Sequence, residues 1–347
     1  MLKPNAHLCV MRLSAIGDVC HAVAMVQAVQ AARPDISITW VIGKVEFRLL
    51  KDMPGIEFVV FDKKQGKKAR LDLKRRLSGT VFDALFMMQI ALRANWASTV
   101  IKAKVRIGFD SERSKELHGL FTNCQIAAQQ HAHVLEGFMG FANTIGVETP
   151  SQPQWQMPLS DDDHAAAEKL HNSSSPYVVI CPAASKAERC WLTSRYAEVA
   201  DKLHDMGYRV YICGAPAPLD TRLAEEIVTQ AKQPIHNIVG ATSLKQLLAF
   251  IKRAELVIAP DTGPAHMATT VGTPVIGLYA HSNPLRTGPY QNLANVVSVY
   301  DAVIEQQTGK KWQDLKWGKR AKGDDLMAQI QVDAVVTQVE YVLGVNP

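Results

Sequence analysis

The chain lacks the sequence features of membrane-spanning, disulfide-stabilised and secreted proteins. No apolar run approaches the ~20 residues that a membrane helix needs. The first residues show no signal-peptide pattern, because Met11 and Arg12 follow only a short apolar run. None of the six cysteines forms a C-x-x-C pair, and Cys9, Cys181 and Cys213 lie in expected core strands. This usage is typical of reduced thiols, so we expect a cytoplasmic protein without a transmembrane segment, whose membrane contact is at most peripheral.

Metal and cofactor motifs are also missing. The turn after the first expected strand reads SAIGD rather than G-x-G-x-x-G, and no acidic residue stands where a nicotinamide ribose would be held, which disfavours a hydride-transfer enzyme. His131 and His133 have no further ligand at metal-site spacing. We find no D-x-D motif suited to a divalent cation. The sequence therefore predicts neither a metal site nor a cofactor.

The 347 residues are long enough for two domains, and their apolar share of 47% is ordinary for full cores. Strand and helix patterns alternate through two halves, separated by the proline-rich segment 149–158 (TPSQPQWQMP). We predict an α/β protein of two Rossmann-like domains that face each other across a cleft. The expected bounds are 1–157 and 158–325, with an amphipathic helix at 326–343 that can pack back on the N-terminal domain.

The most informative stretch is 259–280, APDTGPAHMATTVGTPVIGLYA. An apolar strand ends at Pro260, and Asp261 and Thr262 stand where a helix N-cap belongs. Gly263 and Pro264 fill the opening turn, and a second apolar strand follows the helix. The free backbone N–H groups of such a helix form a ready anion site, to which His266 one turn later can add a hydrogen bond. An ordinary, well-capped strand–helix–strand unit fits the same pattern.

Two other features point to ligands. Asp18 lies at the carboxyl end of the first strand, where open α/β sheets place their ligands, although capping of the next helix explains it as well. Residues 63–76 are strongly basic and contain one acid, Asp72. Such a run is usually a solvated helix face, but an anionic partner is plausible, namely a phosphorylated lipid, a membrane surface or nucleic acid. Nucleic acid is disfavoured because the run lacks aromatic residues for base stacking.

With these residues in hand, the chain resembles glycosyltransferase family 9, the bacterial lipopolysaccharide heptosyltransferases. The resemblance covers nearly the whole chain, and its anchors are SAIGD (14–18), the loop that ends in Arg189 and Trp191, and DTGPAH (261–266) with GTPVIGLY (272–279). It implies a GT-B fold whose N-terminal domain receives the acceptor and whose C-terminal domain binds the sugar nucleotide.

The implied reaction is an inverting, metal-independent transfer of heptose from ADP-heptose to a Kdo (3-deoxy-octulosonate) residue of the lipopolysaccharide inner core. The acceptor, Kdo-lipid A, places the enzyme peripherally on the inner face of the cytoplasmic membrane. Asp18 matches the family's proposed general base. Arg189 stands where relatives usually have a lysine that contacts the donor, and an arginine keeps the charge with a different reach.

The resemblance also assigns the remaining site residues. On the donor side Asp261 is expected to hold sugar hydroxyls, the amides of Thr262 and Gly263 to face the diphosphate, and His266 to lie near the phosphates. Lys186 is added to the donor side from its own position, because it lies just past the strand at 177–181 in the loop that carries Arg189. The expected acceptor side consists of Lys63, Lys64, Lys67, Lys68, Arg75, Arg76 and Arg113. One departure concerns the ribose: Pro216 occupies the position of the acid that some relatives use, and Asp220 is the nearest substitute.

Three alternatives stay open at this point. A transferase of the same fold can use another sugar nucleotide or another core acceptor, and the Pro216 departure keeps this alternative alive. A nucleotide-sugar epimerase on the same scaffold would convert the donor without any acceptor. A non-catalytic nucleotide-sugar-binding protein would bind ADP without transfer, but it does not need both Asp18 and Asp261.

Overall fold

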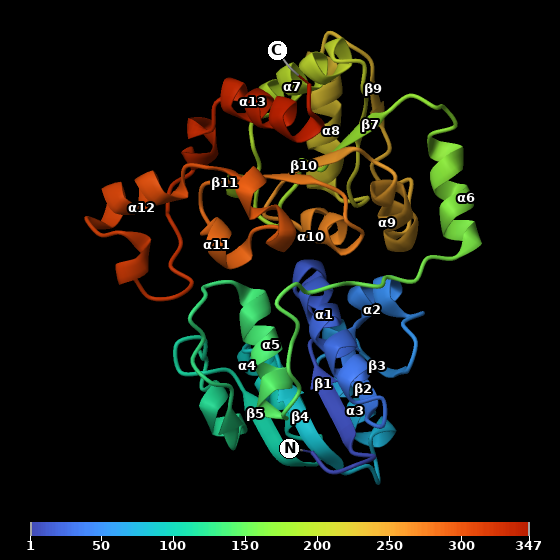
Figure 1. The fold of residues 1–347 in the computed structure, drawn as a ribbon, viewed down its shortest axis with the longest axis vertical. Coiled ribbons are helices and arrows are strands. Elements are labelled where there is room, and N and C mark those ends of the chain that lie inside the picture. The colour runs from blue at the N-terminus through green and yellow to red at the C-terminus, as the bar shows by residue number, and fades with distance from the viewer. Residues whose placement is uncertain (1, 346–347) are drawn as a thin grey trace. The chain divides into compact units, whose positions relative to one another are not determined.

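The computed structural model describes residues 2–345, which fold as two α/β units that divide between Pro158 and Leu159 (Figure 1). Within these residues each unit holds one six-stranded sheet, and all paired strands are parallel. A parallel sheet needs a helical crossover between strands and cover on both faces. This requirement explains why the strands are almost continuously apolar. The predicted α/β class with two Rossmann-like halves is confirmed.

The sheet of unit 1 has the strand order β3-β2-β1-β4-β5-β6. Its strands are β1 (His7–Met11), β2 (Ser37–Gly43), β3 (Ile56–Phe61), β4 (Phe82–Met87), β5 (Ala103–Gly108) and β6 (Cys124–Gln125). Its α-helices are α1 (Ile16–Ala32), α2 (Lys44–Leu50), α3 (Lys67–Arg76), α4 (Leu92–Ser98) and α5 (Val134–Thr144). The chain runs outward from β1 to β3 and then continues on the other side of β1, so the winding reverses between β1 and β4.

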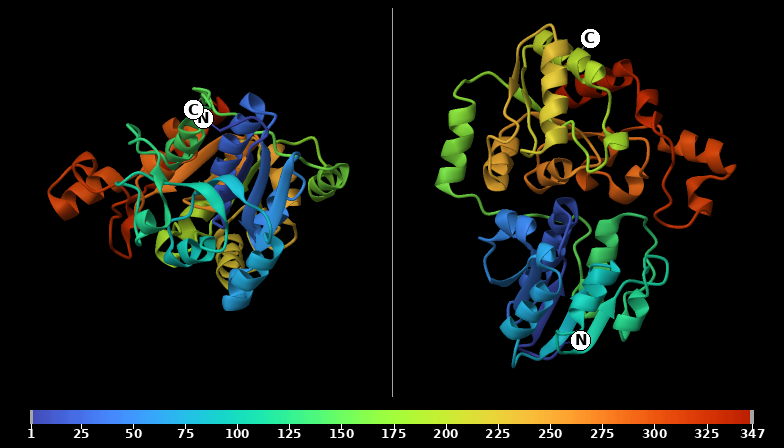
Figure 2. Two further views of the ribbon diagram at one scale, coloured as in Figure 1. Left: turned by 90° about the horizontal axis from the view of Figure 1, so that it is seen from below. Right: turned by 180° about the vertical axis from the view of Figure 1, so that it is seen from behind.

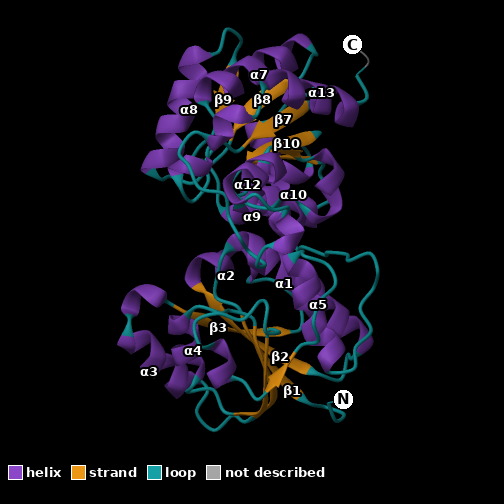
Figure 3. Ribbon diagram, turned by 90° about the vertical axis from the view of Figure 1, so that its left-hand side faces the viewer, coloured by secondary structure: helices purple, strands orange, loops and turns teal. Residues whose placement is uncertain are grey.

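Helices cover both faces of this sheet. Helices α3 and α4 lie on one side, and α1 and α5 lie together on the other (Figure 3). Leu73 of α3 and Ala97 of α4 belong to the same buried cluster as Cys9 and Met11 of β1. The right-hand view of Figure 2 shows α3, α4 and the segment after β5 on one face of the unit. On this face, the inner sides of α3 and α4 make apolar contacts with the sheet, and the outer side of α3 carries the basic run.

The sheet of unit 2 has the order β12-β11-β10-β7-β8-β9. Its strands are β7 (Tyr177–Ile180), β8 (Arg209–Ile212), β9 (Ile235–Asn237), β10 (Leu256–Pro260), β11 (Val275–Tyr279) and β12 (Val297–Ser298). Its α-helices are α6 (Asp161–Leu170), α7 (Thr193–Asp205), α8 (Pro218–Gln230), α9 (Leu244–Lys252), α10 (Gly263–Thr270), α11 (Pro284–Thr287), α12 (Tyr300–Thr308) and α13 (Val332–Leu343). The winding reverses between β7 and β10.

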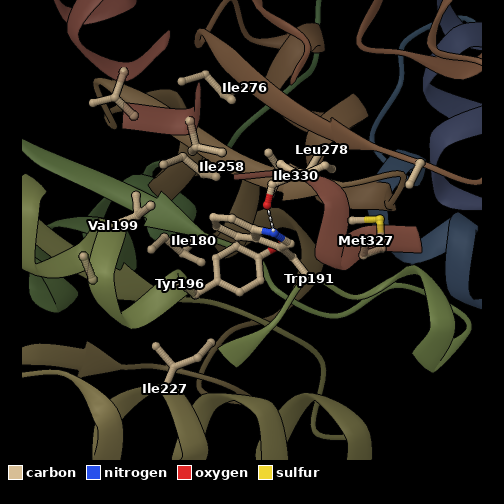
Figure 4. Close-up of a cluster of buried hydrophobic side chains, with 14 of the residues drawn as sticks. Ile180, Trp191, Tyr196, Val199, Ile227, Ile258, Ile276, Leu278, Met327 and Ile330 are labelled. Carbon is tan, nitrogen blue, oxygen red and sulfur yellow. Dashed lines mark hydrogen bonds between the residues drawn. The ribbon is translucent and has the colours of Figure 1, made fainter. Parts of the chain in front are cut away.

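The expected terminal helix over 326–343 is shorter than predicted. Residues 326–329 form a 3₁₀ turn, and α13 begins only at Val332. The carbonyl of Ile330 accepts a hydrogen bond of 3.1 Å from the indole of buried Trp191 (Figure 4), and the guanidinium of Arg195 donates to the carbonyls of Ala328 and Ile330. These side chains take carbonyls that a continuous helix would use, so the helix breaks here.

The placement of α13 also differs from the sequence-based possibility that it packs on the N-terminal domain. It packs on α7, β11 and β12, within unit 2. Val335 and Val339 of α13 belong to the buried cluster around Trp191 and Tyr196. The periodicity of the helix is correct, but an apolar stripe does not specify which apolar surface it covers.

Three further segments depart from the sequence-based elements. Helix α12 was not predicted, and α11 lies in the stretch 281–290 that was expected to be a loop. Helix α1 begins at Ile16, three residues earlier than expected. The expected linker is anchored on α1, because the Trp155 indole donates to the carbonyl of Cys20 at 2.7 Å and Gln156 exchanges hydrogen bonds with Gln27.

Candidate active site

Three loops at the carboxyl edge of the unit 2 sheet bring polar side chains together. Strands β7, β10 and β11 are neighbours in this sheet, and they are followed by Arg189, Asp261 and Ser282 respectively. Open parallel sheets bind ligands at the carboxyl ends of their strands, where the winding reverses. The reversal lies between β7 and β10, so Arg189 and Asp261 occupy the position at which a ligand is expected.

Asp261 is the centre of this cluster. Its Oδ2 atom accepts hydrogen bonds from the Ser282 hydroxyl at 2.9 Å and from the Arg189 guanidinium at 3.3 Å, while Nε2 of His266 lies 3.9 Å from Oδ1. Burial opposes the charged form of Asp261, but His266, Ser282 and Arg189 together outweigh it and hold the pKa of this carboxyl below its ordinary value. The cluster therefore contains a fixed negative charge beside a fixed positive one.

Helix α10 begins directly beside Asp261. Thr262 is its N-cap residue, and the Thr262 side chain makes no capping hydrogen bond. The carboxylate of Asp261 is turned toward Arg189 and Ser282. Since no capping side chain bonds the first N–H groups, the end of α10 keeps donors and a partial positive charge that suit an anion. His266 lies one turn into the same helix and is buried.

Arg189 is held by short polar contacts on a 3₁₀ turn, Ala187–Arg189. One terminal nitrogen binds Asp261, and the other donates to the hydroxyl of Ser185. Its Nε atom is buried without a hydrogen-bond partner among the described residues. The guanidinium is thus fixed in place and retains further N–H donors, Nε among them, for a ligand. Lys186, by contrast, is exposed and pairs with Glu188 at 3.3 Å.

Asp220 lies in the first turn of α8 and supports the loop after β8. Its Oδ1 atom accepts a hydrogen bond of 2.9 Å from the backbone N–H of Ala215. The contact is tight, because a Cβ atom on Gly214 would come within 2.6 Å of the same oxygen. The structure therefore gives Asp220 a role in holding the turn, and ribose binding by Asp220 stays a prediction.

The corresponding reversal point of unit 1 lies between β1 and β4, and it carries Asp18. This residue sits in the first turn of α1, where its carboxylate accepts from the N–H of Ala15 at 3.2 Å and forms an ion pair with Arg12. Arg12 is buried, donates to the carbonyl of Met88 after β4, and lies 5.3 Å from the centre of the Phe138 ring. Asp18 is about one-third exposed, so it remains accessible to a ligand.

Sequence reasoning missed two charged residues near Asp18. Arg12 follows β1 directly, and its position at the carboxyl end of a central strand was the available signal. Glu46 of α2 is buried, and its pKa is raised mainly by burial, while the charges of Arg12 and Asp18 also act on it. A carboxyl group with a raised pKa near a ligand edge is a candidate acid or base.

The predicted acceptor residues fall into two groups. The basic residues of the run are exposed along the 3₁₀ turn Lys63–Gln65 and along α3: Lys63, Lys64, Lys67, Lys68, Arg75 and Arg76. Arg113 is buried instead, and its guanidinium binds the carboxylate of Asp110 at 3.1 Å and the carbonyl of His131 at 2.7 Å. The structure gives Arg113 a part in holding these loops, and acceptor contact by Arg113 stays a prediction.

The outer surface of α3 continues onto α4. The Arg70 guanidinium lies 4.5 Å from the centre of the Trp96 ring and donates to Thr99 at 2.9 Å. The 3₁₀ helix His118–Phe121 packs on α4 in turn. Large apolar side chains are exposed on all three elements: Leu71, Leu92, Trp96, Leu117 and Leu120. We call this combination of basic and apolar side chains on α3, α4 and 117–120 the basic–apolar surface.

Two findings concern possible ligands and membranes. Among residues 2–345, no three His, Cys, Asp or Glu side chains group closely enough to hold a metal ion. In the same described part, no helix has the length and apolar character required to cross a bilayer.

Two doubly wound α/β units in one chain are the architecture of GT-B glycosyltransferases. The comparisons agree with this class. The sequence profile described as Glycosyltransferase family 9 (heptosyltransferase) matches residues 70–316. The chain is 46% identical to the lipopolysaccharide core heptosyltransferase OpsX of Haemophilus influenzae, over 96% of both chains. The chain belongs to glycosyltransferase family 9, the heptosyltransferases, and is a glycosyltransferase.

Solved structures show the same fold. A glycosyl transferase family 9 protein from Veillonella parvula matches with a TM-score of 0.79 at 20% identity, over 98% of both chains. The ADP-heptose LPS heptosyltransferase II of E. coli matches with a TM-score of 0.73 at 20% identity, over 97% of this chain and 98% of that one. Both comparisons include residues of both units, so the fold assignment extends over nearly all of the chain.

Proposed function

We propose that this enzyme transfers heptose from ADP-heptose to a Kdo residue of the lipopolysaccharide inner core, with inversion and without a divalent metal. The observation that carries the proposal is the buried pair of Arg189 and Asp261 beside the uncapped end of α10. The name of the Haemophilus relative supports the core acceptor, and the name of the E. coli relative supports the donor. Both relatives span nearly the same length as this chain.

In the proposed donor complex, the diphosphate lies at the amide groups of Thr262 and Gly263. Negative charge grows on this diphosphate as the bond to the sugar breaks. The end of α10, the guanidinium charge of Arg189 and the exposed Lys186 then stabilise that charge, which is the task that a metal ion performs in other transferases. Removal of one such fixed donor typically lowers the rate by about 10²–10³. Asp261, held by Ser282 and Arg189, is oriented to accept hydrogen bonds from sugar hydroxyls.

The proposed general base is Asp18. The acceptor hydroxyl attacks the anomeric carbon from the side opposite to ADP, its proton passes to the carboxylate of Asp18, and ADP leaves with the bonding electron pair. A single displacement of this kind inverts the anomeric centre and needs no covalent enzyme intermediate. A positioned base contributes about 10²–10⁴ to the rate. The ion pair with Arg12 fixes the direction of the carboxylate.

We further propose that the enzyme works at the membrane surface, since its acceptor is a lipid. Support comes from the basic–apolar surface, where cations attract anionic headgroups and apolar side chains insert at the interface. Leu117 has a φ angle of 60°, which is costly for a leucine, and its side chain is exposed. Packing within the protein gains little from such a residue, whereas contact with a lipid surface would.

A transfer assay tests the proposal. Purified enzyme is incubated with ADP-heptose and Kdo-lipid A, and the products are weighed by mass spectrometry. We expect the acceptor to gain one heptose and ADP to appear in equal amount, with a chelator present throughout. A donor panel that includes UDP-linked and GDP-linked sugars should give no comparable product. Conversion of the donor without acceptor would instead indicate an epimerase, and ADP binding without any turnover would indicate a binding protein.

A further inference from the structure

The segment after α12 is irregular but firmly held. The N–H of Ala321 donates to the carbonyl of His281 at 3.0 Å, and Nε2 of His281 donates to the carbonyl of Gly323 at 2.8 Å. The side chain of Gln307 bonds both backbone groups of Lys322. A long loop without regular structure is costly to order and is commonly retained for binding. Hydrogen bonds therefore hold this loop in a defined position beside the loop that follows β11.

Residues 320–324 of this segment form one wall of a pocket of about 300 Å³, which Arg189 also lines. Five of its lining residues carry basic side chains: Lys186, Arg189, His281, Arg320 and Lys322. Only two acids line it, Glu188 and Asp324, and Glu188 is paired with Lys186. Four permanent cations against two acids leave an excess of two positive charges before His281 is counted. The pocket is therefore suited to an anionic group.

Two buried nitrogen atoms in the lining lack partners. Nε of Arg189 and Nδ1 of His281 have no hydrogen-bond partner in the part of the chain that the structure describes, and both residues are buried. Buried polar atoms are nearly always satisfied in folded proteins. Arg189 and His281 both line the pocket, so a ligand there can supply an acceptor for Nε of Arg189 and a donor for Nδ1 of His281.

The pocket is distinct from the amide end of α10, because no residue of α10 lines it. It shares Arg189 and Lys186 with the proposed diphosphate site, and Arg189 joins it to Asp261. The diphosphate is the only charged group of an ADP-linked heptose at neutral pH, so a second basic pocket has no partner on that donor. Kdo, in contrast, is an acidic sugar that carries a carboxylate.

We propose that this pocket, formed by Arg189, His281 and the 320–324 segment, binds an oxyanion carried by the acceptor sugar. The proposal rests on the proposed function, because the acidity of the acceptor follows from it. Arg320 and Lys322 supply the charge, Arg189 supplies N–H donors for the oxyanion, and Nδ1 of His281 can accept a hydrogen bond from a sugar hydroxyl. Arg189 then lies between donor and acceptor, which allows one guanidinium to hold two anions.

The test is the double variant R320A/K322A. The matched control is K310A/K311A, which removes the same charge from exposed lysines of the same segment that do not line the pocket. At saturating ADP-heptose, we expect the acceptor KM of the pocket variant to rise about tenfold, equivalent to about 1.4 kcal/mol. The ADP Kd measured by calorimetry should stay within about twofold for both variants, and the control should keep the acceptor KM of the wild type.

The other outcomes are also decisive. A weaker ADP Kd with an unchanged acceptor KM would assign the pocket to the donor and overturn the proposal. No change in either constant, or an equal change in the control, would overturn it as well. Titration of wild type and R320A/K322A with free 3-deoxy-octulosonate, without donor, separates this proposal from the proposed function. Loss of that binding in the variant supports the pocket even if ADP-heptose proves not to be the donor.

Discussion

Nη1 of Arg189 lies 3.3 Å from Oδ2 of Asp261, and both side chains are largely buried at the point where the winding of the unit 2 sheet reverses. The pair joins the loop after β7 to the loop after β10. A buried ion pair is only weakly stabilising as a whole, but loss of one partner leaves an uncompensated charge. The same guanidinium is thus required for the architecture of the site and, in our proposal, for charge stabilisation during transfer.

Substitution of Arg189 separates these two contributions. We expect R189A to lower kcat by about 10²–10³ and to weaken ADP binding, because the leaving diphosphate loses a fixed cation. R189K keeps the charge but cannot bind Asp261, Ser185 and a phosphate at once, so its kcat should lie between those of R189A and the wild type. Steady-state kinetics and ADP calorimetry measure both effects. Wild-type constants in R189A would contradict the role of this residue.

The general base is tested by D18N. Asparagine preserves the size of the side chain and can still accept from the N–H of Ala15, but it cannot take a proton. We expect kcat to fall by about 10²–10⁴ while the ADP Kd stays unchanged, since the proposed donor residues belong to unit 2. Rapid single-turnover measurements with Kdo-lipid A give the chemical step directly.

The variant E46Q is the matched comparison for D18N, because Glu46 is a buried carboxyl whose pKa is raised above its ordinary value. If Asp18 is the base, E46Q should keep at least one-tenth of the wild-type rate. A tenfold loss corresponds to about 1.4 kcal/mol, within the range of the net contribution of one hydrogen bond that positions a neighbouring group. The reverse pattern, an active D18N and an inactive E46Q, would assign proton removal to Glu46.

Much of the fold and of the donor-side site could be predicted from the sequence, because local patterns determine the strands and the helix ends. Apolar runs bounded by turn residues gave the parallel strands, and APDTGPAH gave the start of α10, since capping and glycine preferences act within a few residues. The break at Ile330 could not be predicted, because it depends on Trp191 and Arg195, which lie more than 130 residues away in the chain. Ser282 was missed for the same reason: only the strand order brings it to Asp261.

The burial of Arg113 shows a further limit. Its sequence context, a loop rich in charged residues, gave no sign that Asp110 and the carbonyl of His131 take up its guanidinium. Long-range polar satisfaction of this kind depends on three-dimensional packing. The same argument applies to the pocket at Arg320, whose basic residues were visible in the sequence but whose partners His281 and Arg189 come from distant loops.

The basic–apolar surface predicts binding to anionic vesicles. We expect the wild type to sediment with vesicles that contain phosphatidylglycerol, and L117D/L120D to lose most of this binding. Leu120 is 78% exposed, and aspartate tolerates the left-handed backbone of Leu117 better than leucine does, so the variant should fold normally. A suitable control is Y341D, which adds a negative charge at a residue of α13 that is 76% exposed.

Charge contributes to the same binding and can be tested separately. Reversal of Lys67, Lys68, Arg75 and Arg76 to glutamate should reduce vesicle binding by at least tenfold, since each cation near an anionic surface contributes about 1 kcal/mol. Raised salt should weaken the binding of the wild type in the same direction. If all variants bound equally to neutral and to anionic vesicles, the basic–apolar surface would not be a lipid-binding site, and its charges would only keep the protein soluble.

His118 makes the stability of unit 1 sensitive to acid. It is buried on the 3₁₀ helix after β5, where Phe109 N–H points at its Nε2 atom (3.4 Å) and Nδ1 lies 2.9 Å from the side-chain oxygen of Asn95. In this arrangement Nδ1 carries the proton and Nε2 accepts. A second proton would face the N–H of Phe109, and burial lowers the pKa of His118 from 6.5 to about 4.

The sign of the effect follows from this shift. Between pH 6.5 and about 4 the unfolded chain binds a proton at His118 that the folded chain excludes, so acidification through this range removes stability. The loss at pH 5 relative to pH 8 is about 2 kcal/mol. H118Q retains an oxygen acceptor and an amide donor but does not titrate, so its urea midpoint should fall less between these pH values. H131Q, a change at an exposed histidine, should keep the wild-type slope, and parallel curves for H118Q and the wild type would contradict a neutral, buried His118.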